Sequence, residues 1–451
     1  MGKYQAYPEY EDTKVQWLPD MPHHWGIERI KRMLRLKRTL VGKKSSEYQL
    51  LSLTLKGIIT RDISTGEGKI PESFDTYQEV EKNDLVFCLF DMDETPRTVG
   101  LSALDGMITG AYNVYGCLDK CYPAYASYYF LHIDKFKGLR PFYTGLRKVV
   151  RSETFDNIEI PCPPYEEQAQ IANFLDHETA KIDTLIEKQQ QLIKLLKEKR
   201  QAVISHAVTK GLNPQAPMKD SGVEWLGEVP EDWVVSRLGF HTLKIGSGKT
   251  PKGGAEIYQK EGVLFLRSQN VYDDGLRISE SESVYISESI HDEMRTTKVF
   301  GGDILLNITG GSIGRTCLVP LEFIEANVNQ HVCIIRLPNC LREFISMVLK
   351  STPIKEQIGA IQTGGNREGL NFEQISKFSF ALPPESERGE IVQSVKISLA
   401  KLDALEEQSN RAIKLMQERR TALISAAVTG KIDVRNWQAP TCEYQATEQT
   451  A

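Results

Sequence analysis

Two long segments of the chain carry apolar residues at alternating steps of three and four. The first begins at Pro163-Pro164 and the second at Pro383-Pro384, and each continues from there for roughly 40 residues without a further proline. This spacing is the heptad pattern of a coiled coil. The prolines predict the helix starts, and Gly211 and Gly430 predict the ends. The predicted seam consists of Ile182, Leu185, Leu192, Leu196 and Val203 in the first segment and Leu402, Leu405, Ala412, Met416 and Leu423 in the second, with the polar Gln189 and Ser409 at matching positions.

The stretch before each long helix alternates short β-rich runs with turn residues, which predicts two mixed α/β regions. A short helix is also expected at 340–350. The predicted strands are LVFCLF (85–90), ASYYFLHI (126–133), VLFLRS (263–268), DILLNITG (303–310) and VCIIRL (332–337).

The chain contains an internal repeat, which decides how its fold is interpreted. The two helical segments align without a gap, and a second repeat pairs VQWLPDMPHHWGIERI from Val15 with VEWLGEVPEDWVVSRL from Val223. Between these shared ends the two middle regions differ in length and sequence. Only traces match there: Asn83-Asp84-Leu85 against Gly302-Asp303-Ile304, and Gly145-Leu146-Arg147 against Gly365-Asn366-Arg367. A duplicated framework with divergent middles suits a scaffold that presents two different recognition surfaces.

These elements predict an α+β fold in which two mixed α/β domains are separated by two long antiparallel coiled-coil helices, as a pseudo-twofold tandem repeat. A pseudo-twofold relation would place the two domains at opposite ends of the helix pair. The expected boundaries are an N-terminal segment 1–14, a first domain 15–162, a first helical region 163–212, a linker 213–222, a second domain 223–382, a second helical region 383–433 and a polar tail 434–451, expected to be disordered.

Length and composition favour a protein of several domains in the cytoplasm. The chain has 451 residues, of which 41% are hydrophobic, and no run is long enough to span a membrane. Its start lacks the apolar core of a secretion signal. The eight cysteines are scattered, with only Cys117 and Cys121 close together, so we expect buried free thiols rather than a zinc site. A net charge of −5 and a pI of about 6.0 argue against a nucleic acid wrapped over the whole surface but allow a local basic face.

The stretch IGSGKTPKGG (245–254) resembles the phosphate loop of an ATPase. Position 243, where such a loop carries its first glycine, holds leucine. The loop must also lead into a helix that faces the phosphate, whereas Pro251, Gly253 and Gly254 follow here. A glycine-rich loop with two lysines fits contact with the phosphates or base edges of a nucleic acid better.

The tetrapeptide CPPY (162–165) resembles an adenine-methyltransferase motif that opens with Asp, Asn or Ser. Sulfur is a weak hydrogen-bond acceptor, so Cys162 is a poor substitute. The repeat copy, LPPE (382–385), has neither an acceptor nor an aromatic residue, and we interpret the prolines as helix starts. His23 and His24 correspond to Glu231 and Asp232 in the second copy, and we interpret them as solvated turn residues rather than metal ligands.

Several motifs in a fixed, repeated order resemble one known family, the specificity subunits of type I restriction-modification systems. The resemblance covers about 10–435. It is carried by MKDSGVEWLGEVPEDWVVSRL (218–238) with its weaker N-terminal copy, the GxTP-like loop 248–251, GDILLNITGGSIGR (302–315), GLNFEQISKFSFALPP (369–384) and the PP-x-x-E-Q helix that ends in AVTKG or AVTGK. The first half departs from the GxTP pattern and has VGKKS at 41–45, which leaves the role of that loop open.

The resemblance implies two target-recognition domains, 15–162 and 223–382, each reading one half of a bipartite site in double-stranded DNA. It also implies helical regions that dock two methyltransferase subunits, and restriction/translocase subunits in the larger enzyme. The chain itself would be non-catalytic and without a metal, and S-adenosylmethionine, ATP and Mg would belong to its partners. Two readers on a rigid helix pair would act as a ruler for half-sites near one helical turn, about 34 Å, apart.

Basic and amide side chains near glycine-rich turns are the best candidates for DNA contact, since bases are read by Arg, Lys, Asn and Gln and phosphates by Lys and Arg. The acidic stretch 273–293 should face away from DNA, because it would repel phosphate. The candidates are Lys43, Lys44, Lys56, Arg61, Arg147 and Lys148 in the first domain and Lys249, Lys252, Arg267, Gln269, Asn270, Arg315, Asn366 and Arg367 in the second.

Two other classes of protein remain open at the level of sequence. A coiled-coil scaffold that binds no DNA would explain the helices but not the loops rich in Gly, Lys, Arg and Asn. An adenine methyltransferase or nucleotide-binding enzyme is supported only by the two degraded motifs, and binding of ATP or S-adenosylmethionine by the purified chain would identify it.

Overall fold

The computed structural model describes residues 4–15, 18–62, 73–279, 283–363 and 369–439, and it divides into two compact units. Unit 1 comprises Met1–Gln189 and Arg411–Ala451, and unit 2 comprises Gln190–Asn410. Two long helices, α4 (Tyr165–Lys210) and α9 (Glu385–Val428), contribute one part to each unit. The expected boundaries give each helix a region of its own, and the two compact units each include a part of both helices.

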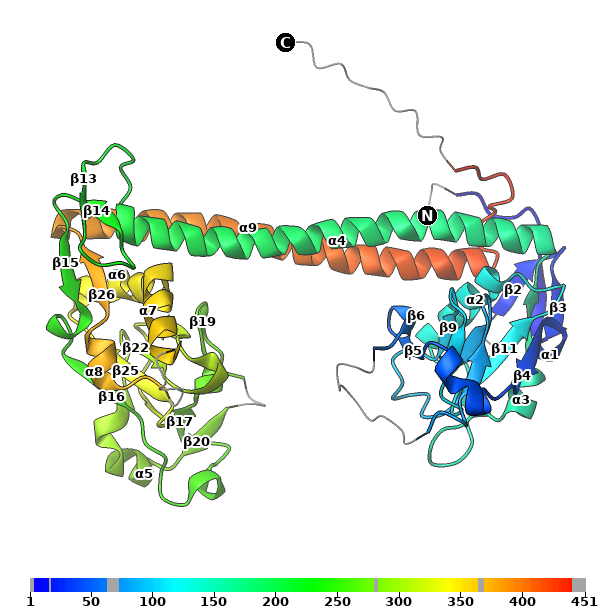
Figure 1. The fold of residues 1–451 in the computed structure, drawn as a ribbon, viewed down its shortest axis with the longest axis horizontal. Coiled ribbons are helices and arrows are strands. Elements are labelled where there is room, and N and C mark those ends of the chain that lie inside the picture. The colour runs from blue at the N-terminus through cyan, green and yellow to red at the C-terminus, as the bar shows by residue number, and fades with distance from the viewer. Residues whose placement is uncertain (1–3, 16–17, 63–72, 280–282, 364–368, 440–451) are drawn as a thin grey trace, which may run out of the picture. The chain divides into compact units, whose positions relative to one another are not determined.

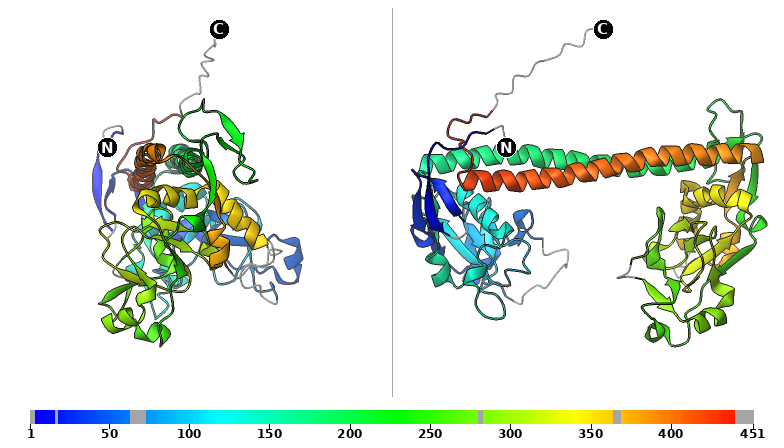
Figure 2. Two further views of the ribbon diagram at one scale, coloured as in Figure 1. Left: turned by 90° about the vertical axis from the view of Figure 1, so that its left-hand side faces the viewer. Right: turned by 180° about the vertical axis from the view of Figure 1, so that it is seen from behind.

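The two helices pack against each other in antiparallel fashion within each unit (Figures 1 and 2). In unit 1 the first part of α4 lies beside the last part of α9, where Arg420 Nε donates to Asp183 Oδ1 at 2.9 Å. In unit 2 the last part of α4 lies beside the first part of α9, where Arg200 pairs with Asp403. The two ion pairs occupy equivalent positions of the repeat, so both units use the same pairing.

The seam between the helices follows seven of the ten predicted apolar positions and shifts by one residue at the other three. Ile182, Leu196 and Leu423 are buried, Ser409 is buried too, and Val203, Leu402, Ala412 and Met416 are half-buried. Leu185, Leu192 and Leu405 lie on the exposed face, and their neighbours Ile186, Ile193 and Glu406 turn inward instead. Adjacent Leu-Ile pairs in the sequence fit either phase of the heptad, so the pattern alone did not select between them.

The shifted seam makes a prediction about neighbouring residues. Ile186→Ala should lower the free energy of unfolding by about 1–2 kcal/mol, because Ile186 packs against the core of unit 1. Leu185→Ala should cost under about 0.5 kcal/mol, since its side chain is exposed. Urea unfolding of both variants measures the difference, and a larger loss for Leu185→Ala would contradict this seam.

The first domain, in unit 1, is built on a four-stranded sheet in the order β4-β11-β8-β9. Leu85 and Phe87 on one face of this sheet join the main core of the unit, and Val86 and Val114 on the other face form a smaller cluster with strands β5–β7 and β10. The elements are β1 Tyr10–Val15, β2 Leu18–Pro22, β3 Gly26–Arg29, α1 Ile30–Met33, β4 Leu34–Lys37, η1 Gly42–Glu47, β5 Leu51–Thr54, β6 Gly57–Thr60, β7 Gln78–Val80, β8 Leu85–Phe87, β9 Val99–Leu101, β10 Gly106–Ile108, β11 Asn113–Cys117, α2 Pro123–Lys135, η2 Arg140–Phe142, α3 Ser152–Asp156 and β12 Glu159–Cys162.

The second domain, in unit 2, repeats this architecture with a sheet in the order β16-β25-β22-β23. A second sheet, β20-β17-β24-β21, lies beyond it and contains one parallel pair, β17 with β24. The elements are β13 Met218–Asp220, β14 Glu228–Pro230, β15 Val234–Arg237, η3 Leu238–Phe240, β16 Lys244–Ser247, η4 Gly254–Ile257, β17 Val263–Leu266, η5 Ser268–Asn270, β18 Val271–Tyr272, β19 Gly275–Leu276, β20 Val284–Ile286, α5 Glu288–Glu293, η6 Arg295–Thr297, β21 Lys298–Val299, β22 Ile304–Asn307, η7 Gly310–Ser312, β23 Thr316–Leu318, β24 Ala326–Val328, β25 Val332–Arg336, α6 Asn339–Lys350, α7 Thr352–Thr363, α8 Phe372–Ser376 and β26 Ser379–Leu382.

One predicted strand is wrong: the run 126–133 lies within helix α2. Its β-branched and aromatic composition suggested a strand, but Tyr125, Tyr129 and Ile133 are buried at steps of four, which is helical spacing. Pro123 begins this helix, as proline often does. The other four predicted strands contain β8, β17, β22 and β25, and the expected helix at 340–350 is α6.

The shared sequence ends form the same local structure in both units. β1 pairs with β2 with Tyr10 opposite Pro22, and β13 pairs with β14 with Met218 opposite Pro230, which is the same register. Strand β1 therefore extends the first domain back into the segment 1–14 that the sequence had set apart. Among the described residues, no helix combines the length and the apolar character needed to cross a membrane.

Candidate nucleic-acid interface

The polar loops of both domains lie at the same edge of the central four-stranded sheet. At this edge two strands end and the strand between them begins. In the first domain β4 and β8 end where β11 starts, and in the second β16 and β22 end where β25 starts. We call this edge the sheet end. Matching turns precede β8 and β22: Asn83 and Gly302 both have positive φ, and the Asp84 and Asp303 carboxylates each accept from the amide three residues earlier. These turns fix the correspondence of residues between the two domains.

The loop that resembled a phosphate loop leaves β16 at the sheet end of the second domain. The Gly248 amide donates to the Val332 carbonyl and the Lys249 amide donates to the Val328 carbonyl, both at 3.1 Å. The loop continues to η4, a single short turn, so its amides are bound to the neighbouring loop rather than gathered at the start of a long helix. Lys249 and Lys252 are exposed, and the loop presents both to solvent.

Four more candidates of the second domain lie around the same edge. The Asn307 amide at the end of β22 donates to the Arg315 carbonyl at 2.8 Å, and its side chain donates to the Ser268 carbonyl at 2.8 Å, beside Arg267 and Gln269. Asn270 is buried, and its amide group bonds the backbone of Arg267 and Arg277. Asn270 therefore shapes the loop, whereas Gln269 and Arg315 are exposed.

Arg315 shares an aromatic platform with a residue of the acidic stretch. Its guanidinium lies 4.9 Å from the ring centre of Tyr272, and that of Arg277 lies 3.7 Å from the same ring. The beginning of the stretch 273–293 thus lies beside a candidate DNA-binding arginine. Its Asp273 caps the amide of Thr316 at 3.0 Å, so at least this carboxylate has a structural partner.

In the first domain, Arg147 and Lys148 lie at the sheet end and face an acidic loop. Arg147 makes two contacts with the Asp91 carboxylate, at 2.5 and 3.2 Å, and Lys148 pairs with Asp93 and Glu94 at 3.1 and 2.8 Å. The Arg147 guanidinium lowers the pKa of Asp91, and Lys148 lowers the pKa of Asp93. Two of the candidates, Arg147 and Lys148, therefore already have carboxylate partners.

The remaining candidates are spread more widely. Lys43 and Lys44 are exposed on η1, after the buried Val41. Lys56 lies at the turn of the β5–β6 hairpin and Arg61 at its open end, so these two do not lie together. Asn366 and Arg367 lie outside the described residues.

The acidic loop makes a prediction for DNA binding. In a complex that binds DNA, Asp91→Asn combined with Asp93→Asn should raise affinity and make the slope of log affinity against log salt more negative by about one, because Arg147 loses its carboxylate partner and can reach a phosphate, whereas Lys148 keeps Glu94. Equilibrium titrations at several salt concentrations measure this slope. Glu153→Gln, an exposed acid on α3, is the control, and an unchanged slope in the double variant would contradict the prediction.

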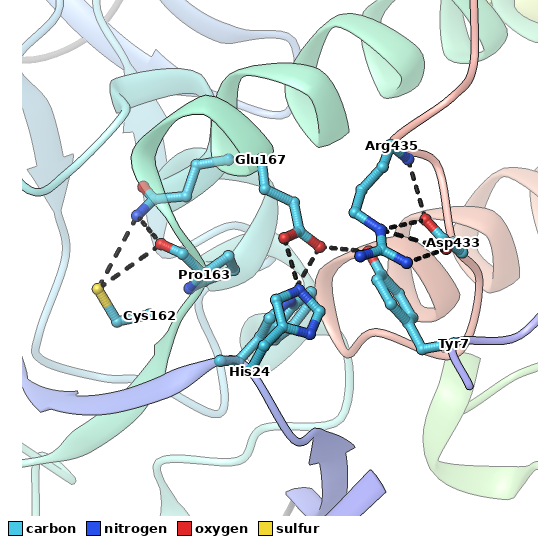
Figure 3. A network of polar contacts seen from close by, with 9 residues as sticks. Tyr7, His24, Cys162, Pro163, Glu167, Asp433 and Arg435 are labelled. Atoms are coloured by element: carbon cyan, nitrogen blue, oxygen red, sulfur yellow. Dashed lines mark hydrogen bonds and ion pairs between the residues drawn. The ribbon is translucent and has the colours of Figure 1, made fainter. Parts of the chain in front are cut away.

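A carboxylate holds each long helix to its domain at the helix start, and it is buried in α4 and half-buried in α9. Figure 3 shows the site in α4. Glu167 on α4 accepts from Trp25 Nε1 at 2.9 Å, from the Tyr7 hydroxyl at 2.5 Å and bonds His24 at 2.8 Å. Glu387 on α9 accepts from Trp233 Nε1 at 2.8 Å in the same way. Burial, together with the hydrogen bond to Glu167, raises the pKa of Tyr7. These contacts join the start of α4 to the segment 7–25 of the same unit.

The residues of the CPPY motif and the two histidines make contacts within the fold. In CPPY, Gln168 Nε2 donates to the Pro163 carbonyl at 2.8 Å and lies 3.9 Å from Cys162 Sγ, within the helix start. His24 is bound to the buried Glu167, so our interpretation of both histidines as solvated holds only for His23. Cys340 is exposed, contrary to the expectation of buried thiols, whereas Cys88, Cys121, Cys317 and Cys333 are buried. Among the described residues, no three His, Cys, Asp or Glu side chains form a metal-binding group.

Further side chains at the sheet ends were not predicted from the sequence. Phe90 stacks on Tyr112 in the first domain, and Thr309 bonds His331 in the second. Phe90 and Thr309 each lie six residues beyond the matching aspartates, Asp84 and Asp303. Extending that short match along the chain would have found both.

The family of the chain follows from comparison with known sequences. Residues 113–195 and 230–415 match the sequence model of the type I restriction modification DNA specificity domain. The match covers more than half of the chain, which therefore belongs to this family.

The chain is also similar to curated specificity subunits, at low sequence identity. The chain is 24% identical over 320 residues to the type I restriction enzyme EcoKI specificity subunit of Escherichia coli strain K12, and the alignment covers 67% of the chain and 63% of that protein. It is 27% identical over 315 residues to the EcoBI specificity subunit of Escherichia coli, covering 67% and 64%. The chain thus spans less than two thirds of the length of these relatives.

Two solved structures share the fold. A chain from a study of complex assembly and conformational transition of a type I R-M system has a TM-score of 0.68 at 14% identity, covering 91% of this chain and 99% of that one. The HsdS subunit from Thermoanaerobacter tengcongensis has a TM-score of 0.50 at 15% identity, covering 91% and 98%. The predicted α+β fold, with two mixed domains and two long antiparallel helices, is confirmed.

Proposed function

We propose that this protein is the sequence-specific DNA-recognition subunit of a type I restriction-modification complex, and that each mixed α/β domain reads one half of a bipartite site. The observation that carries the proposal is the shared sheet end. Two domains of one topology, from a family described as DNA specificity domains, present different side chains at one equivalent edge. A bipartite, asymmetric DNA site has two different half-sites, and two domains of the same fold with different contact residues can each recognise one of them.

The partners follow from the same proposal. Two methyltransferase subunits dock on α4 and α9, and restriction/translocase subunits complete the complex. The chain is non-catalytic, and S-adenosylmethionine, ATP and Mg are held by the partner subunits. The proposal includes double-stranded DNA as a partner and a cytoplasmic location for the complex. The net charge of −5 supports DNA binding by the assembled complex rather than by the isolated chain.

Methylation mapping tests the proposal. The chain is co-expressed with its methyltransferase subunits in a host that lacks both, and adenine methylation is mapped across the genome. One bipartite motif, methylated only when this chain is present, is the expected result. Methylation that does not depend on the chain, or that has no sequence preference, would overturn the proposal and favour a scaffold without a role in DNA reading.

The helix pair makes a further prediction, that it measures the spacing between half-sites. A heptad inserted into both helices, between Gln189 and Gln190 and between Asn410 and Arg411, preserves the seam and adds about 10 Å. The mapped spacer should lengthen by about three base pairs at about 3.4 Å each, with both half-sites unchanged. An unchanged spacer in a variant that still methylates DNA would contradict this role of the helices.

A further inference from the structure

The first observation concerns one position that the two domains share. Phe90 and Thr309 each lie six residues after the aspartate of the matching turn. The residue before each, Leu89 or Ile308, accepts a hydrogen bond from the amide of Val150 or Leu370, at 2.9 and 2.8 Å. The residue after each, Asp91 or Gly310, has positive φ. The backbone at this position is therefore the same, and only the side chain differs.

The second observation is what each side chain contacts. Phe90 stacks on Tyr112, the residue directly before β11, with ring centres 6.0 Å apart and planes inclined by 16°. The Arg147 guanidinium lies 5.1 Å from the centre of the Phe90 ring. Phe90 and Tyr112 are half-buried and Arg147 is exposed, so the sheet end of the first domain presents two partly exposed aromatic rings with one cation over the Phe90 ring.

The second domain presents a chain of hydrogen bonds at the same place. The Thr309 hydroxyl lies 2.7 Å from His331 Nδ1, and Gln330 Nε2 lies 3.1 Å from His331 Nε2. The Thr250 hydroxyl donates to Gln330 Oε1. Gln330 therefore has its carbonyl oxygen held by Thr250 and its amide nitrogen held by His331. The exposed amide group is fixed with a donor and an acceptor side by side.

Resting on the proposed function, we propose that this sheet-end position determines which base each domain accepts. Gln330, oriented by His331 and Thr250, recognises adenine in one half-site through the N6 donor and N7 acceptor of that base. The Phe90–Tyr112 face recognises thymine in the other half-site through its methyl group. Both pairings follow from the groups that bases display in the major groove.

Gln330→Glu is the sharpest test, because a carboxylate accepts hydrogen bonds but cannot donate them. Glutamate suits the N4 donor of cytosine and cannot pair with N7 of adenine. With the variant in complex with its methyltransferase subunits, the preferred base at one position of one half-site should change from adenine to cytosine, with about a tenfold or greater loss of methylation rate on the original site. The measurement is the rate of methylation across a library of randomised sites.

The bipartite site supplies an internal control, since the half-site read by the first domain must stay unchanged. Gln259→Glu introduces the same charge at an exposed glutamine of unit 2 away from the sheet end and should leave the motif unchanged. Phe90→Ser should remove a thymine preference from the other half-site only.

The outcomes separate this inference from the proposed function. A wild-type complex that methylates without sequence preference would refute the proposed function itself. A Gln330→Glu complex that methylates the original motif at the original rate would refute only the sheet-end inference, as would a change in both half-sites. If Gln330→Glu does not assemble, Thr309→Val preserves the volume and removes the hydroxyl that holds His331. An unchanged selectivity ratio at the same base would then refute the inference.

Discussion

Gly248→Ala should destabilise unit 2 by more than about 3 kcal/mol and abolish selective methylation at one half-site. A Cβ at this position would overlap the backbone carbonyl oxygen of Val328, and a backbone atom cannot move aside as the end of a side chain can. The loop that carries Lys249 would have to leave the sheet end. Urea unfolding combined with domain-resolved hydrogen exchange measures the loss of stability, and the methylation map measures the loss of reading.

Gly246→Ala is the matched control for that variant. Gly246 lies two residues earlier in β16, and a Cβ there would meet only the end of the Lys244 side chain at 3.6 Å, an ordinary contact. The control should change the free energy of unfolding by less than about 1 kcal/mol. Equal effects of the two substitutions would show that the close approach of the loop to Val328 does not constrain the domain.

Glu167→Ala should have the second large effect, a loss of about 3–5 kcal/mol from unit 1. The substitution leaves three groups around a buried position, Trp25 Nε1, the Tyr7 hydroxyl and His24, without their common partner, and each such group costs about 1–3 kcal/mol. Hydrogen-exchange rates in α4 and in β2 measure the loss. The first part of α4 should exchange faster, while the described part of unit 2 remains unchanged.

Glu387→Ala is the matched variant in the other half of the repeat. Glu387 is less buried than Glu167 and accepts from Trp233. The expected loss is about 1–3 kcal/mol and should be confined to unit 2. Equal losses in the two variants would show that Tyr7 and His24, which have no counterpart in the repeat sequence, do not contribute to the stability of unit 1.

Much of the framework could be predicted from the sequence, because the repeat supplies every signal twice. The helix starts at 163 and 383 carry prolines, and the seam phase is visible at Ile182 and Leu402, which lie at equivalent positions. The pattern could not choose between Leu185 and Ile186, because both are apolar and the heptad tolerates either. The run 126–133 was misassigned because its aromatic residues have high β-propensity, which the packing of α2 overrides.

The candidate site was predictable only in part, for a physical reason. Residue type identifies groups that can bind DNA, and several of these, such as Arg315 and Lys249, do converge at one edge. Residue type does not show which of them already have partners. The Asn270 side chain donates to the Arg277 carbonyl in its own loop, and the Arg147 guanidinium pairs with the Asp91 carboxylate. Phe90 and Thr309 were overlooked because the short match at Asp84 and Asp303 was not extended along the chain, and neither residue is a basic or amide group.

The pairing of the helices has a consequence for each half of the repeat. Each half of the repeat ends in a helix whose last turn packs on the tryptophan of the other half: Gly211 lies against Trp233, and Gly430 against Trp25. A single half-length polypeptide would therefore lack the element that closes its own core. A half-length polypeptide with this fold would need the helix end of a second copy of itself to complete its core.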